Sequence, residues 1–194
     1  RYRVMAAVCA AIMGCAWGKE GVCLDSNGNE VDWWFTYKLP DGYQYAYYDA
    51  SMGAQAGPLT LFPTTLDSDT HPAALIRTLR NLVPSGANTT EDDDCPYFMY
   101  NDQPDNASPG SNYGHTKGVV AVGDTSSFWL VHSVPNFPSS SGSGKFYFPS
   151  TETDYGQTFL CMTISSDDVD TVAGQLLYTT PYIYFNSAQD AASK

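Results

Sequence analysis

Basic residues are scarce in this chain of 194 residues. Nine Lys and Arg stand against 21 Asp and Glu, so the formal net charge is 9 − 21 = −12. A generic nucleic-acid-binding protein neutralises phosphates with clustered Lys and Arg, and few are present here. With 43% hydrophobic and 14% aromatic residues, the composition excludes a disordered acidic tail and predicts a single folded domain.

Motifs that bind metals or nucleotides are also missing. The sequence contains no CxxC or HExxH motif, its three His are far apart, and it has no glycine-rich phosphate-binding loop. We therefore expect no metal ion and no cofactor.

Long apolar runs are nearly absent. The single one, residues 4–16, is too short to span a membrane, follows Arg1 and Arg3, and is bounded by small residues. This is the pattern of a secretory signal peptide. We predict a signal peptide over residues 1–18, with a buried core helix as the alternative, and a soluble mature protein that enters the secretory pathway without a membrane anchor.

The mature chain keeps few cysteines. Residues 19–194 contain Cys23, Cys95 and Cys161, and in a secreted protein this odd number predicts one disulfide and one leftover thiol. Asn88 and Asn106 each begin an Asn-x-Ser/Thr sequon in a polar stretch typical of surface loops. We predict that both are glycosylated.

Residue patterns predict strands interspersed with two helices. β-branched and aromatic runs indicate strands over residues 31–37, 43–48, 97–100, 117–122, 127–133, 158–164 and 182–185. Helical spacing indicates a helix over residues 71–82, capped by Asp69 or Thr70 with Pro72 in its first turn, and a second from a Ser165–Asp168 capping box to Pro181. The fold class is α/β or mixed α+β, with a mixed sheet and flanking helices.

One short pattern suggests chemistry. In Gly114-His-Thr-Lys-Gly118, where a loop enters a predicted strand, extended backbone would point His115 and Lys117 to the same side. There an imidazole can attack or protonate while an ammonium neutralises phosphate oxygens. A surface His beside a solvated Lys is the alternative. His132 lies in an apolar strand, where a core histidine is the simpler interpretation from the residues alone.

This motif lies among further blocks that together resemble the deoxyribonuclease II family, from about Cys23 to about Tyr184. The blocks occur in family order at residues 32–33, 37–40, 100–104, 114–119, 128–138 and 155–161. The resemblance implies a phospholipase D-like half domain. It also implies an acid endonuclease of lysosomes or secretions that hydrolyses DNA without a metal ion and leaves 3′-phosphate ends.

The resemblance also assigns roles. It implies that His115 is a catalytic imidazole, that Lys117 binds phosphate and that His132 is a supporting residue. It further implies a Cys23–Cys161 disulfide, which leaves Cys95 outside the bridge.

The superfamily assembles its site from two HxK motifs, one from each half, and this chain has one. We therefore expect residues 19–194 to be the N-terminal half of such a domain. The C-terminal half would be absent, or a second copy would pair with this one. The superfamily also commonly has an Asp five residues beyond the Lys, where this chain has Val122; Asp124 lies seven beyond.

In the implied mechanism one His attacks phosphorus and the other protonates the leaving 5′ oxygen. Acid pH suits this pair, and it also weakens the repulsion between an acidic chain and DNA, because His gain charge and carboxylates lose it. Two alternatives remain. The chain could be a secreted binding or immune-modulating protein that has lost catalysis, or a phospholipase D-like lipid hydrolase.

Overall fold

The computed structural model of the chain describes residues 20–53, 57, 59–82, 95–105, 107–139 and 146–187. The predicted signal peptide over residues 1–18 lies outside these ranges, and so do the predicted glycosylation sites Asn88 and Asn106. No helix in the described ranges is long and apolar enough to cross a membrane.

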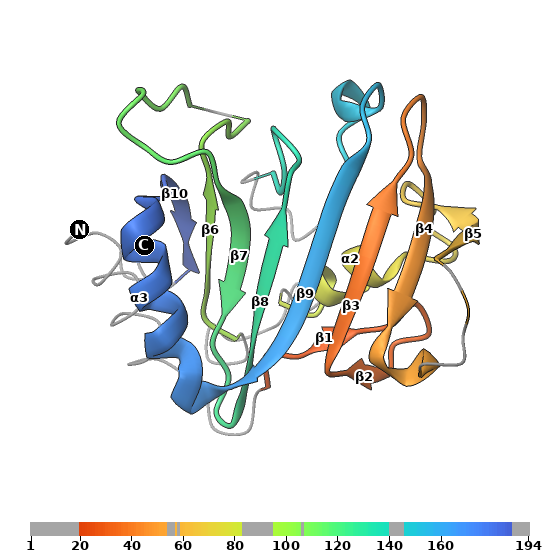
Figure 1. Ribbon diagram of the computed structural model, residues 1–194, viewed down its shortest axis with the longest axis horizontal. Helices are drawn as coiled ribbons and strands as arrows, with labels where there is room; N and C mark the ends of the chain where they lie inside the picture. The colour runs from red at the N-terminus through yellow and green to blue at the C-terminus, as the bar shows by residue number, and fades with distance from the viewer. Residues whose placement is uncertain are drawn as a thin grey trace, which may run out of the picture.

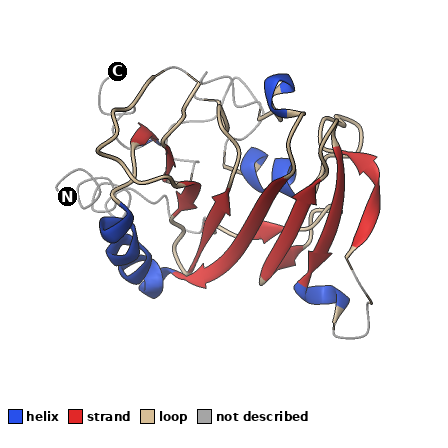
Figure 2. Ribbon diagram, turned by 45° about the horizontal axis from the view of Figure 1, so that its top comes forward, coloured by secondary structure: helices blue, strands red, loops and turns tan. Residues whose placement is uncertain are grey.

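The fold is built on an eight-stranded sheet whose described pairings are all antiparallel. The strand order is β10-β6-β7-β8-β9-β3-β4-β5. In chain order the strands are β3 (Trp33–Lys38), β4 (Gln44–Asp49), β5 (Thr60–Thr65), β6 (Tyr97–Asn101), β7 (Lys117–Ala121), β8 (Ser126–His132), β9 (Gln157–Ser165) and β10 (Ile183–Asn186). The sheet twists along its length (Figure 2). A separate two-stranded ribbon pairs β1 (Cys23–Leu24) with β2 (Glu30–Val31).

The two α-helices of the described ranges lie on opposite faces of the sheet. Figure 1 shows α3 (Val169–Thr179) in front of the β6–β7 end and α2 (Ala74–Arg80) behind the sheet. The buried clusters agree with this placement. Residues of α3 share one cluster with Val120 of β7, whereas residues of α2 share another with Val119, the preceding residue of the same strand. Successive residues of a strand point to opposite faces. Single turns of 3₁₀ helix complete the described elements: η1 (Ala50–Met52), η3 (Ser150–Glu152) and η4 (Ser166–Asp168).

Most predicted elements are confirmed, with corrections at their ends and edges. The class, strands with flanking helices, is confirmed, but the sheet is antiparallel rather than mixed. The first helix is shorter than predicted: Ala73 is its N-cap, without a side-chain cap, so capping by Asp69 or Thr70 was wrong and Pro72 precedes the helix. Ser165 does act as a cap, but its hydroxyl accepts the Asp167 N–H and begins η4. Strands β1, β2 and β5 were not predicted.

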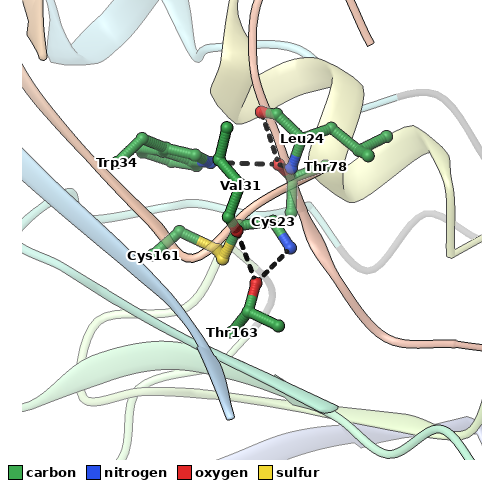
Figure 3. The surroundings of a disulfide bond; sticks show 7 residues. All are labelled: Cys23, Leu24, Val31, Trp34, Thr78, Cys161 and Thr163. Carbon is green, nitrogen blue, oxygen red and sulfur yellow. Dashed lines mark hydrogen bonds between the residues drawn. A yellow bond between two sulfur atoms is a disulfide. The ribbon is translucent and has the colours of Figure 1, made fainter. Parts of the chain in front are cut away.

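A disulfide fastens the β1 ribbon to the sheet (Figure 3). It joins Cys23 to Cys161 of β9, with 6.0 Å between their Cα atoms and a sequence separation of 138. Threonine hydroxyls support it: Thr163 accepts the Cys23 N–H at 3.0 Å, and Thr78 of α2 accepts the Leu24 N–H at 3.0 Å. The thiol of Cys95 lies elsewhere and donates to a backbone carbonyl just after β7.

Candidate active site

The register of three neighbouring strands gathers polar residues at one end of the sheet. Lys117, the first residue of β7, pairs with Asn101 at the end of β6 and with His132 at the end of β8. Asp102 follows β6 directly and His115 precedes β7 by two residues. Because β6 and β7 are antiparallel, the chain between them leaves and re-enters the sheet at this edge.

Asp102 joins the two residues of the HxK motif. Its Oδ2 accepts a hydrogen bond from His115 Nδ1 at 2.7 Å, and its Oδ1 accepts a short one from Lys117 Nζ. The His115 side chain is 80% exposed, whereas those of Asp102 and Lys117 are 17% and 2% exposed. The carboxylate therefore holds an exposed imidazole and a buried ammonium in one cluster.

This cluster sets the protonation of Asp102 and the orientation of His115. Burial alone would raise the pKa of Asp102, but the hydrogen bonds and charges of Lys117 and His115 outweigh it and hold that pKa below its usual range. An ionised carboxylate only accepts hydrogen bonds, so His115 Nδ1 carries the proton. Nε2 is then the ring nitrogen left to attack or to protonate a substrate.

The motif is not fully extended, contrary to the prediction. The Thr116 N–H donates to the Gly114 carbonyl at 2.8 Å, which makes a tight turn centred on His115, and β7 begins only at Lys117. The Gly114 N–H donates to the carbonyl of Thr180, just past α3, at 3.1 Å. A side chain at Gly114 would overlap the backbone of Thr179. Asp102, rather than strand alternation, brings the two side chains together.

Gly118, which follows the motif, is required for steric reasons. Tyr100 is fully buried, and its hydroxyl lies where a Cβ on Gly118 would stand. That hydroxyl accepts the Trp129 indole N–H at 2.9 Å. Gly118 thus allows Tyr100 to pack against β7 directly beside Lys117.

His132 is a buried residue next to the cluster. Its Nδ1 accepts the Val134 N–H at 3.2 Å, and its Nε2 has no hydrogen-bond partner within the described part of the chain. Its ring packs against both Phe137 and Phe159, with centroids 5.4 and 6.1 Å away. Burial, with the nearby charge of Lys117, lowers its pKa to about 3. His132 is therefore neutral at mildly acid pH.

Sequence reasoning missed two residues of the site. Asp102 was quoted within residues 100–104 without a role, although a carboxylate in a family block was the signal that could have identified it. Asn101 is buried, and its amide donates to the carbonyls of Val134 and Phe137 at 3.1 and 2.9 Å, which holds the segment after β8 against the end of β6. In the ranges that the structure describes, no three His, Cys, Asp or Glu side chains are grouped to hold a metal ion.

Comparison with known proteins identifies relatives of this chain. The family model described as Deoxyribonuclease II matches residues 22–194. Deoxyribonuclease-2-alpha of Sus scrofa is 33% identical over 178 residues, covering 84% of this chain and 45% of the relative. Deoxyribonuclease-2-alpha of Rattus norvegicus is 35% identical, with 84% and 47% covered. Cell death-related nuclease 6 of Caenorhabditis elegans is 33% identical, with 89% and 46% covered. The chain spans about half the length of the curated relatives it matches. No solved structure matches it.

Proposed function

The chain belongs to the deoxyribonuclease II family, and from this premise we propose that it carries half of the active site of an acid endonuclease that hydrolyses DNA without a metal ion. The observation that supports the proposal is the single carboxylate of Asp102 between His115 and Lys117. It joins a solvent-facing imidazole to a fixed positive charge, two kinds of group that cleave a phosphodiester bond without a metal ion.

The reaction needs two imidazoles. One Nε2 attacks phosphorus, so that a P–N bond forms while the bond from phosphorus to the 5′ oxygen breaks, and the second imidazole gives its proton to that leaving oxygen. Water, deprotonated by the second imidazole, then displaces the first and leaves a 3′-phosphate. His115 supplies one of these imidazoles and Asp102 fixes its orientation. The other comes from a second HxK motif outside this chain.

Lys117 supplies the positive charge. Its side chain is 2% exposed and its ammonium is held by Asp102, so its position is set before substrate arrives. A preorganised charge stabilises the negative charge that develops on phosphoryl oxygens without costly reorganisation. Because the pKa of Asp102 is low, the carboxylate stays ionised near pH 5 and keeps this arrangement.

The remaining parts of the proposal concern the whole protein. Residues 1–18 act as a signal peptide, and residues 19–194 form the N-terminal half of a phospholipase D-like domain. The second HxK motif comes from a C-terminal half of the same polypeptide or from a second copy. Asn88 and Asn106 are glycosylated, and the protein works in lysosomes or after secretion.

A second candidate function is a secreted, non-catalytic binding or immune-modulating protein of the same fold. It is consistent with the single HxK motif of residues 1–194, since the catalytic site needs two. Cleavage of plasmid DNA by the complete protein at about pH 5 with chelator present distinguishes the two. The enzyme produces fragments with 3′-phosphate ends. A strict need for Mg²⁺, or 3′-hydroxyl ends, would contradict the proposed mechanism, and intact plasmid would favour the binding protein.

A further inference from the structure

Two tyrosines contact each other beside the HxK motif. Tyr113 precedes His115 by two residues, and Tyr182 follows α3. Their ring centroids are 4.9 Å apart and their planes meet at 76°, which is an edge-to-face contact. Both residues are half-buried. Because the rings are nearly perpendicular, each keeps a flat face that the other does not cover. We call these two residues the tyrosine pair.

Backbone hydrogen bonds attach the tyrosine pair to both segments of the candidate active site. The N–H of Gly114, in the turn that carries the exposed imidazole, donates to the carbonyl of Thr180 at 3.1 Å. The N–H of Asn101, directly before the carboxylate of the cluster, donates to the carbonyl of Tyr182 at 3.0 Å. The rings are therefore held at the edge of the sheet where the imidazole and the carboxylate meet.

The backbone that leads from α3 to Tyr182 is strained. Thr180, the C-cap of α3, has φ 49° and ψ 60° and so lies in the left-handed region. A β-branched residue rarely adopts this conformation. Such strain persists where the surrounding structure fixes it, and it is most frequent at active sites and ligand clamps. Here it lies at the turn that places Tyr182 against Tyr113.

We propose that the tyrosine pair binds an unpaired nucleobase next to the phosphate that His115 contacts. A phosphate within a DNA strand has a nucleoside on each side, so a strand that reaches His115 brings bases close to it. Two residues of chain span at most about 7 Å, which places Tyr113 within that distance of His115. Aromatic rings stack on the π-face of every base, and this binding requires no particular sequence. The inference rests on the proposed function, because it needs DNA at His115.

Stacking on the tyrosine pair requires a base that is outside a double helix. Unstacking a base from a duplex costs free energy, and this cost is least for DNA that is already single-stranded. Tyr113 and Tyr182 should therefore strengthen the binding of single-stranded DNA more than that of duplex DNA. A residue that merely positioned His115 would instead affect the cleavage of both to the same degree.

Fluorescence anisotropy of a labelled single-stranded oligothymidine tests the inference, at about pH 5 with chelator present. The complete protein carries His115→Ala, which leaves the DNA uncut and removes the imidazole that a merely positioning residue would serve. We expect Tyr113→Leu and Tyr182→Leu each to raise the dissociation constant at least about fivefold, the usual loss when a stacking ring is removed. Tyr113→Phe keeps the ring and should bind like the parent.

The matched control is Tyr178→Leu, which removes a tyrosine that is 86% exposed near the end of α3. It should leave the dissociation constant unchanged. Unchanged affinity in both leucine variants of the tyrosine pair would overturn the inference, and so would an equal loss of affinity for single-stranded and duplex DNA. If the leucine variants unfold, NMR of the tyrosine rings during titration with the oligothymidine tests the same contact without a substitution in the pair. Rings of Tyr113 and Tyr182 that do not shift would overturn it.

DNA cleavage by the complete protein with His115 in place separates the two proposals. Oligonucleotide binding that depends on the tyrosine pair, in a protein that does not cleave DNA, contradicts the proposed function alone. Cleavage by a protein whose affinity for single-stranded DNA does not depend on the pair contradicts this inference alone.

Discussion

His132 makes the free energy of unfolding depend on pH in a direction that can be measured. Its pKa is about 3 in the folded chain, against about 6.5 in an unfolded one. Because the pKa is lower in the folded chain, the contribution of neutral His132 to the free energy of unfolding is complete above pH 6.5 and is lost as the pH falls below 6.5. One pKa unit corresponds to about 1.4 kcal/mol, so lowering the pH from 7 to 5 removes about 2 kcal/mol through this residue.

Urea unfolding at pH 7 and pH 5 measures this loss. Other groups titrate over the same range, so the diagnostic quantity is the difference between the wild type and His132→Gln, a variant of similar size that does not titrate. We expect the variant to be less stable at pH 7, because the Val134 N–H loses its acceptor, but to lose about 2 kcal/mol less on acidification. If both proteins lost the same free energy, or if the His132 ring titrated by NMR near pH 6.5, the burial argument would be wrong.

Three further experiments test the Asp102 cluster, the glycine beside it and the disulfide. Asp102→Asn leaves the buried ammonium of Lys117 without its counter-ion and should cost about 3 to 5 kcal/mol of unfolding free energy at pH 7. Since the pKa of Asp102 is lowered, the contribution of its carboxylate to the free energy of unfolding should persist at pH 5 and disappear only below about pH 4. Equal stability of the variant and the wild type at pH 5 would therefore contradict the geometry. Gly118→Ala should lower the free energy of unfolding by about 3 kcal/mol, because the new Cβ displaces Tyr100. The control Gly174→Ala places its Cβ in open space on α3 and should raise that free energy by up to about 1 kcal/mol. The same change in both variants would refute the steric argument. Replacing both cysteines of the disulfide by Ser should cost up to about 5 kcal/mol in urea unfolding, because the bridge closes a loop of 138 residues, and an unchanged midpoint would refute that role.

Local sequence patterns predicted most strands of the sheet, but they did not predict the edge strand β5 or the exact start of α2. Strand β3 was predicted because its aromatic and β-branched residues form a continuous run that only a sheet accommodates well. Strand β5 was not predicted because Pro63 interrupts its run, and the structure places it at the edge of the sheet, where proline is tolerated. The start of α2 was predicted wrongly because suitable capping residues occur upstream, but the helix begins without a side-chain cap.

In the candidate site, too, residues close in sequence were predicted and contacts between distant residues were not. The HxK spacing identified His115 and Lys117, which are close in sequence. Asp102 lies 15 residues from Lys117, and the two meet only because β6 and β7 pair in one register. No local pattern contains that register. The low pKa of His132 likewise depends on burial by Phe137 and Phe159, which the strand sequence alone does not specify.

The most direct test of the central claim is the rate of DNA cleavage by His115→Ala in the complete protein, at about pH 5 with chelator present. The matched control is His71→Ala, because His71 is exposed and lies before α2, away from the Asp102 cluster. We predict that His115→Ala lowers the rate at least about a hundredfold, since an imidazole acting as nucleophile or general acid contributes at least that much. His71→Ala should cleave like the wild type. Wild-type cleavage by His115→Ala would contradict the account.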